Sequence, residues 1–178
     1  MPPHPVVPFG KDFATFATLL MHALSQMPRN AADNHAMHIG MDNAPSSGLW
    51  MEFGVFNGNT LGMMSRRAPH KVVYAFDSFY GLPETWRTTP YDKRLHKYTK
   101  KHAFTRNGMP PVMQTHNIAF LVGHFNDTLP PFLVDHLTTP ISFLHIDSDL
   151  YGSAFFVLNA LKNNIVDGTV IVFDELIN

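Results

Sequence analysis

Five short apolar segments, each followed at once by a glycine or an aspartate, constrain the fold of this sequence more than any other feature. Helical patterns follow two of them, over Thr60–Arg67 and Ser153–Asn164. Short apolar runs separated by helices are typical of parallel strands whose two faces are both covered. The expected fold is therefore α/β, with strands at Leu49–Phe53, Val72–Phe76, Ile118–Val122, Ile141–Ile146 and Thr169–Phe173.

The composition narrows the class of protein. The chain has 178 residues, of which 45% are hydrophobic and 15% charged, enough for one domain with a substantial core. A net charge of −1 favours neither nucleic acid nor an anionic membrane as a partner, and no apolar run is long enough to cross a bilayer. There is no cysteine, and Met1–Pro8 lacks the features of a signal peptide. We therefore expect a cytoplasmic protein that binds neither nucleic acid nor membrane.

Two parts of unequal length are expected. Residues 1–47 form an N-terminal region, with a helix over Asp12–Met27 that ends at Pro28 and a polar stretch of loop or short helices after it. Residues 48–178 hold all the predicted strands and form the main domain. Within it, the basic and aromatic segment 83–117 is expected to be a solvated lid or substrate loop.

The residues directly after the strands are the expected site, because ligands of open parallel sheets bind beyond the carboxyl ends of the strands. The first such turn runs from Glu52 through Gly54 to Gly58, where a dinucleotide fingerprint would have three glycines and no preceding acid. Glycine allows close approach of a ligand, and Thr60 is placed to cap the following helix. A carboxylate beside this turn suits an ammonium group, as in S-adenosylmethionine. The alternative is an ordinary strand-to-helix turn.

Asp77 follows the second strand, about 20 residues beyond the glycine turn. An acid at that position can accept hydrogen bonds from both hydroxyls of a ribose. The alternative is a turn or cap residue, a common role of aspartate.

A second group of acids follows the fourth and fifth strands: Asp147, Asp149, Asp174 and Glu175. In adjacent parallel strands these carboxylates converge, and they repel one another unless one is protonated or a cation lies among them. Oxygen ligands without cysteine suit Mg²⁺, Mn²⁺ or Ca²⁺. Such a cation would lower the pKa of a substrate hydroxyl, with Asp147 as a possible general base. The alternative is that the acids cap the helices that follow.

Five segments together carry a resemblance: WMEFGVFNGNT, VYAFDSFYGLPETW, GHFNDTLPPFL, HIDSDLYGSA and DGTVIVFDE. They resemble the macrocin O-methyltransferase family of class I S-adenosylmethionine-dependent methyltransferases. The resemblance implies a Rossmann-like sheet in the order 3-2-1-4-5, with the last two of the usual seven strands missing here. It also implies methyl transfer to a hydroxyl of a small molecule, often a sugar or polyol, with Mg²⁺ or Mn²⁺.

The resemblance also implies roles for individual residues. The metal would lie at Asp147, Asp174 and Glu175, with Glu175 where relatives usually carry Asp or Asn, and Asp147 would be catalytic. Gly123, His124 and Phe125 would lie against adenine. The full cofactor-binding set is Glu52, Gly54, Phe56, Asn57, Gly58, Thr60, Asp77, Ser78, Gly123, His124, Phe125 and Asp147.

Other interpretations stay open at this stage. The chain could be a truncated nucleoside-binding module without activity, or a nicotinamide-dependent oxidoreductase, which the absence of Gly-x-Gly-x-x-Gly disfavours. His145, on the fourth strand, is expected to be a core residue rather than a base. His35 and His38 are three apart, but no further zinc ligand is evident. The fifth strand would leave an apolar edge that a second subunit could cover, so a homo-oligomer is possible.

Overall fold

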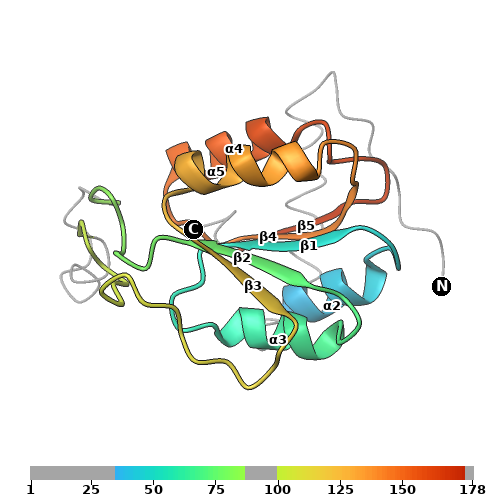
Figure 1. Cartoon of the computed structure of the whole chain (residues 1–178), viewed down its shortest axis with the longest axis horizontal. Coiled ribbons are helices and arrows are strands. Elements are labelled where there is room, and N and C mark those ends of the chain that lie inside the picture. Colours follow the sequence, from blue (N-terminus) through green and yellow to red (C-terminus); the bar gives the residue numbers. More distant parts are fainter. Residues whose placement is uncertain (1–34, 87–99, 175–178) are drawn as a thin grey trace, which may run out of the picture. The chain divides into compact units, whose positions relative to one another are not determined.

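The computed structural model describes residues 35–86 and 100–174 (Figure 1). The chain divides after His35 into two compact units, and the described residues lie almost entirely in the second, Ala36–Asn178. The predicted helix over Asp12–Met27 and the predicted ligand Glu175 both lie outside the described residues.

Five parallel strands form one sheet in the order β3-β2-β1-β4-β5, which confirms the predicted topology. The strand positions agree with the sequence prediction to within one residue at each end. Because every strand runs the same way, all five carboxyl ends meet at one edge of the sheet. The strands are β1 (Leu49–Phe53), β2 (Val73–Asp77), β3 (Ile118–Val122), β4 (Ile141–Ile146) and β5 (Val170–Phe173).

Helices cover both faces of this sheet, as the apolar strands predicted. Helices α2 (His35–Asn43) and α3 (Asn59–Arg67) lie on one face, and α4 (Phe125–Asp135) and α5 (Tyr151–Leu161) lie on the other (Figure 1). Helix α4 was not anticipated by the sequence analysis. Its burial of Leu129 and Phe132 stabilises it even though it contains two prolines that cannot donate a backbone hydrogen bond.

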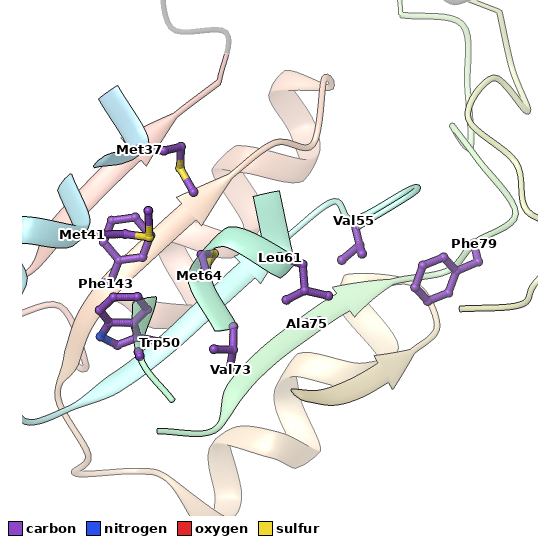
Figure 2. Packing of buried hydrophobic residues seen from close by; sticks show 11 residues of the cluster. Met37, Met41, Trp50, Val55, Leu61, Met64, Val73, Ala75, Phe79 and Phe143 are labelled. Atoms are coloured by element: carbon purple, nitrogen blue, oxygen red, sulfur yellow. The ribbon is translucent and has the colours of Figure 1, made fainter. Parts of the chain in front are cut away.

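The alternation of side chains along β1 and β4 builds two cores, one on each face. Trp50 and Phe143 point toward α2 and α3, where their rings lie 5.0 Å apart among Met37 and Met41 (Figure 2). Met51 and Leu144 point to the other face and pack with α4 and α5. Each large side chain buried in this way contributes roughly 1.5–3 kcal/mol to folding. These cores fix the register of the strands and hence the residues at the carboxyl edge.

Candidate active site

A cavity of about 760 Å³ opens at the carboxyl edge of the sheet. Residues that follow each of the five strands line it, which agrees with the location predicted from the topology. Trp86 and Phe104 also line it, and both come from the described parts of segment 83–117, which the sequence predicts to be a lid or substrate loop. Residues 87–99 of that segment lie outside the described residues. The first turns of α5 add Phe156, which the sequence did not indicate.

The turn after β1 is held against the end of β4. Gly54 has φ 92°, and a Cβ atom there would lie 1.7 Å from the carbonyl oxygen of Asp147. The backbone N–H of Asp147 in turn donates to the carbonyl of Phe53 at 2.8 Å. Glycine at position 54 is therefore required by close contact as well as by conformation.

The far end of this turn leads into α3. Gly58 is the N-cap residue, at φ 77°, and no side chain caps the helix. The expectation that Thr60 caps α3 is wrong, because the helix already begins at Asn59. Phe56 lines the cavity, whereas Asn57, Gly58 and Thr60 are not among its lining residues. Asn57 instead accepts a hydrogen bond from Arg106 at 2.7 Å.

The carboxylate of Asp77 lines the cavity and is already hydrogen-bonded to the backbone. Its Oδ2 accepts from the N–H groups of Val55 (2.9 Å) and Phe56 (3.0 Å), and its Oδ1 accepts from that of Phe79 (2.7 Å). A carboxylate has about four acceptor positions, so roughly one is left for a ligand. Ser78 beside it also lines the cavity, and its hydroxyl accepts from the N–H of Tyr80 at 3.2 Å.

The turn after β3 brings Gly123, His124 and Phe125 to the cavity wall. His124 is the N-cap residue of α4, with no side-chain cap hydrogen bond, and Phe125 opens the helix. The Phe125 ring packs edge-on against Phe53, with centroids 5.3 Å apart. This wall is therefore anchored in the core. Contact of these residues with adenine stays a prediction.

Glu52 lies in the sheet rather than on the cavity wall. It is fully buried near the carboxyl end of β1, and its Oε1 is 2.9 Å from Nδ1 of His145 on β4. The register places the two residues directly opposite each other. Its predicted contact with an ammonium group is untested, and in the structure its described partner is His145. The pairing was not foreseen, because it depends on the register of strands 93 residues apart.

His145 confirms the expectation of a buried core residue, since none of its surface is exposed. Burial lowers the pKa of the imidazole, but the hydrogen bond to Glu52 and the charges of Glu52, Asp147 and Asp174 outweigh burial, so that the pKa is raised. Within the described residues, Nε2 of His145 and Oε2 of Glu52 are buried without a hydrogen-bond partner.

The predicted acid cluster forms at the ends of β4 and β5. Asp147 and Asp174 both line the cavity, and together with a ring nitrogen of His145 they offer ligand atoms that lie within 4.8 Å of one another. Burial, with the nearby charge of Asp174, raises the pKa of Asp147 to about 7, although His145 opposes the shift. An acid in this state favours a cation beside it. Sequence reasoning missed His145 as a member of this group.

Comparison with known proteins identifies the family. The family model described as macrocin O-methyltransferase (TylF) matches residues 29–178. The chain belongs to this family of O-methyltransferases. No curated protein matches the sequence significantly. The family favours methyl transfer over nicotinamide chemistry among the interpretations that the sequence left open.

Solved structures share the fold at low sequence identity. The calicheamicin methyltransferase CalS11 is 20% identical, with 98% of this chain and 86% of that chain aligned and a TM-score of 0.62. A second structure, of apo CalS11, a TDP-rhamnose 3'-O-methyltransferase, is 21% identical over 94% and 72% of the two chains, with a TM-score of 0.57. The O-methyltransferase NovP is 22% identical over 80% and 62%, with a TM-score of 0.50. The likeness shows the Rossmann-like fold of class I methyltransferases.

None of the helices in residues 35–86 and 100–174 has the length and apolar character needed to cross a membrane.

Proposed function

We propose that this protein transfers a methyl group from S-adenosyl-L-methionine to a hydroxyl of a sugar or polyol, with the help of a divalent cation. One observation carries the proposal: a single cavity is lined both by the glycine turn with Asp77 and by the acids Asp147 and Asp174. The first pair suits a nucleoside, and the second suits a cation with a hydroxyl acceptor. Membership of the macrocin O-methyltransferase family supports the same reaction.

The nucleoside end of the cavity fits the cofactor. Gly54 and Gly123 line the cavity, and Asp77 offers its remaining acceptor position to a ribose hydroxyl. His124 and Phe125 form the wall against which adenine would lie. Phe56, Phe104 and Phe125 line this cavity, and apolar walls of this kind limit the access of water to reacting groups.

The acidic end fits a divalent cation. Asp147 and Asp174 supply oxygen ligands close to a ring nitrogen of His145. Nε2 of that ring lacks a hydrogen-bond partner within the described residues. A cation held there supplies charge that lowers the pKa of a nearby hydroxyl. Glu175, the third carboxylate of the predicted set, lies outside the described residues.

The reaction is an in-line displacement. A bond forms between the acceptor oxygen and the methyl carbon while the carbon–sulfur bond breaks, and S-adenosylhomocysteine leaves. Asp147, on the cavity wall, accepts the proton that the hydroxyl loses. Most of the rate then comes from holding oxygen and methyl in contact and in line, a task shared by the walls after β1, β3 and β4.

The test is calorimetric titration of the chain with S-adenosylhomocysteine, beside Asp77→Ala and with NAD as the control ligand. We expect binding of S-adenosylhomocysteine but not of NAD, and binding at least about tenfold weaker in Asp77→Ala, which corresponds to ~1.4 kcal/mol. Circular dichroism would establish that each sample is folded. A folded wild-type chain that ignores S-adenosylhomocysteine would overturn the proposal.

Methyl transfer itself is tested with a panel of sugars and polyols and methyl-labelled S-adenosyl-L-methionine. Transfer that depends on Asp147 and on added cation supports the full proposal. Tight nucleoside binding without transfer to any acceptor would favour the alternative of a binding module.

A further inference from the structure

His145 has a ring nitrogen that the protein leaves without a partner. The side chain is fully buried, and its Nδ1 is 2.9 Å from Oε1 of Glu52, itself fully buried. Among the described residues no hydrogen-bond partner reaches Nε2. Leaving a buried polar atom unpaired costs roughly 1–3 kcal/mol. The folded protein therefore holds Nε2 in place without a hydrogen bond to any of the described residues.

The imidazole ring of His145 lies beside the acids of the cavity. His145 is two residues before Asp147 on the same strand, and the N–H of Asp174 donates to the carbonyl of Ile146 at 3.1 Å, which holds β5 alongside. As a result, one ring nitrogen of His145 and one carboxylate oxygen each of Asp147 and Asp174 lie within 4.8 Å of one another. Since Nδ1 is engaged by Glu52, Nε2 is the nitrogen left for a ligand.

We propose that Nε2 of His145 is a direct ligand in a mixed nitrogen–oxygen site with Asp147 and Asp174, and that this site selects a first-row transition cation such as Mn²⁺ or Co²⁺ over Mg²⁺. The inference rests on the proposed function, because it names the cation for the same acidic end of the cavity. Mg²⁺ prefers oxygen ligands alone, whereas imidazole nitrogen strengthens the binding of transition cations.

Glu52 has a defined part in this arrangement. Histidines that bind metals almost always donate the other ring N–H to a carboxylate or carbonyl, which fixes the tautomer and the ring orientation. Glu52 occupies that position toward Nδ1 of His145. It is thus a positioning residue for the metal site. This also explains why a carboxylate is buried near the carboxyl end of β1, a strand whose other side chains are apolar.

The competing explanation makes His145 a charged imidazolium that balances the acids and binds no metal. The two explanations differ in one observable. A directly coordinated imidazole transfers electron spin from Mn²⁺ to its ¹⁴N nucleus, and a charged imidazolium nearby does not.

The experiment is pulsed electron paramagnetic resonance on the full chain, without a histidine tag, stripped of metal and then loaded with Mn²⁺. We expect ¹⁴N coupling of a coordinated imidazole in the wild type and in His124→Gln, which removes the histidine on the cavity wall. The coupling should disappear in His145→Gln. Calorimetry should show Mn²⁺ affinity about 10–100-fold lower in Glu52→Gln, the range for partners of metal ligands, and Mg²⁺ affinity nearly unchanged.

Bound Mn²⁺ without ¹⁴N coupling in the wild type would overturn the inference, and this result needs no variant to fold. Coupling that survives in a folded His145→Gln would also overturn it. Calorimetry with S-adenosylhomocysteine on the same wild-type sample separates the inference from the proposed function. If ¹⁴N coupling is present and the nucleoside does not bind, the inference stands and the proposed function fails. If the nucleoside binds and no cation does, the inference fails.

Discussion

The carboxyl ends of β2 and β4 each bring an aspartate into the same cavity, but the two carboxylates have opposite surroundings. Asp77 accepts three backbone hydrogen bonds, from Val55, Phe56 and Phe79. Asp147 accepts none from the described residues, and it lies beside Asp174 with its pKa raised to about 7 through burial and that neighbouring charge.

This difference divides the site into two halves. We call the β1–β2 end the finished half and the β4–β5 end the unfinished half. At the β1–β2 end, the carboxylate of Asp77 accepts from the backbone N–H groups of the turn, so the turn has its shape before any ligand arrives. At the β4–β5 end, like charges and a buried unpaired nitrogen raise the free energy of the folded protein until a positive charge joins them. The first half is expected to resist change in solution conditions, and the second to respond to pH and to cations.

The largest effect is expected where the two halves touch. In Gly54→Ala, the new Cβ would lie 1.7 Å from the carbonyl oxygen of Asp147, at a φ of 92°. We expect the free energy of unfolding to fall by about 3 kcal/mol or more, measured by chemical denaturation. In the control Gly152→Ala, the Cβ would meet nothing within 4 Å, and that variant should be as stable as the wild type or up to ~1 kcal/mol more stable. Equal midpoints for Gly54→Ala and the wild type would contradict the contact.

The finished half can be tested by removing one acceptor oxygen from the carboxylate of Asp77. Asp77→Asn leaves a single oxygen for the three N–H groups that the carboxylate now serves. The expected loss of stability is ~1–3 kcal/mol, together with weaker binding of S-adenosylhomocysteine in calorimetry. The same substitution at the exposed turn residue Asp167 is the control and should change neither quantity. If both variants match the wild type, the backbone bonds to Asp77 do not shape the turn.

In the unfinished half, replacing the aspartate should raise the stability of the metal-free protein instead of lowering it. Because the pKa of Asp147 is raised from 3.8 to about 7, the folded protein holds this proton more tightly than the unfolded chain does. Stability therefore falls as the pH rises from about 4 to about 7 and is level above that range. With chelator present, Asp147→Asn should be about 1–3 kcal/mol more stable than the wild type near pH 8 and equal to it near pH 4.

Added Mn²⁺ should reverse the order of Asp147→Asn and the wild type near pH 8, because a cation binds the folded wild type and stabilises it. Thermal unfolding at several pH values measures both effects, with Asp167→Asn as the control. A metal-free wild type that is the more stable protein near pH 8 would remove the distinction between the two halves.

The smallest effect concerns a link between the glycine turn and the segment before β3. Arg106 donates to Oδ1 of Asn57 at 2.7 Å in an exposed hydrogen bond, and its Nε donates to the carbonyl of Met109. Arg106→Ala should lower stability by less than ~1 kcal/mol and weaken S-adenosylhomocysteine binding about twofold. Arg67→Ala, which breaks an exposed ion pair with Asp42 outside the cavity, is the control for binding. An identical affinity in both variants would show that this link does not support the turn.

The strands and their order were predictable because local chemistry decides them. Short apolar runs such as Ile141–Ile146 have few alternatives to a buried strand, and the glycine or aspartate after each run marks the edge where ligands bind. The positions of Asp77, Asp147 and Asp174 on the cavity wall follow from the same pattern.

Helix α4 was not predictable in the same way. Pro130 and Pro131 are signals that normally end a helix, and here they lie inside one. Burial of Leu129 and Phe132 against the sheet outweighs the lost backbone hydrogen bonds, and that burial exists only once the sheet has formed.

The pairing of Glu52 with His145 is a matter of register. Each residue alone is a polar side chain in an apolar strand, and no local rule says that they face each other across β1 and β4. Residues two apart on a strand share a face, so Glu52 lies on the same face as Trp50, and His145 on the same face as Phe143. Both faces turn toward α2 and α3. Aligning the two strands on this pattern would have predicted the pairing.

The two tryptophans of the chain lie in different surroundings. Trp50 is sealed in the core against Phe143, with 4% of its surface exposed, whereas Trp86 is on the wall of the cavity. Their fluorescence therefore comes from two different environments in one molecule. Denaturation must alter the emission of Trp50. A ligand that fills the cavity contacts Trp86 and changes its emission, whereas the emission of the buried Trp50 stays the same. A protein with Trp86→Phe would report folding alone, and one with Trp50→Phe would also report occupancy of the cavity, so unfolding and ligand binding can each be followed by fluorescence.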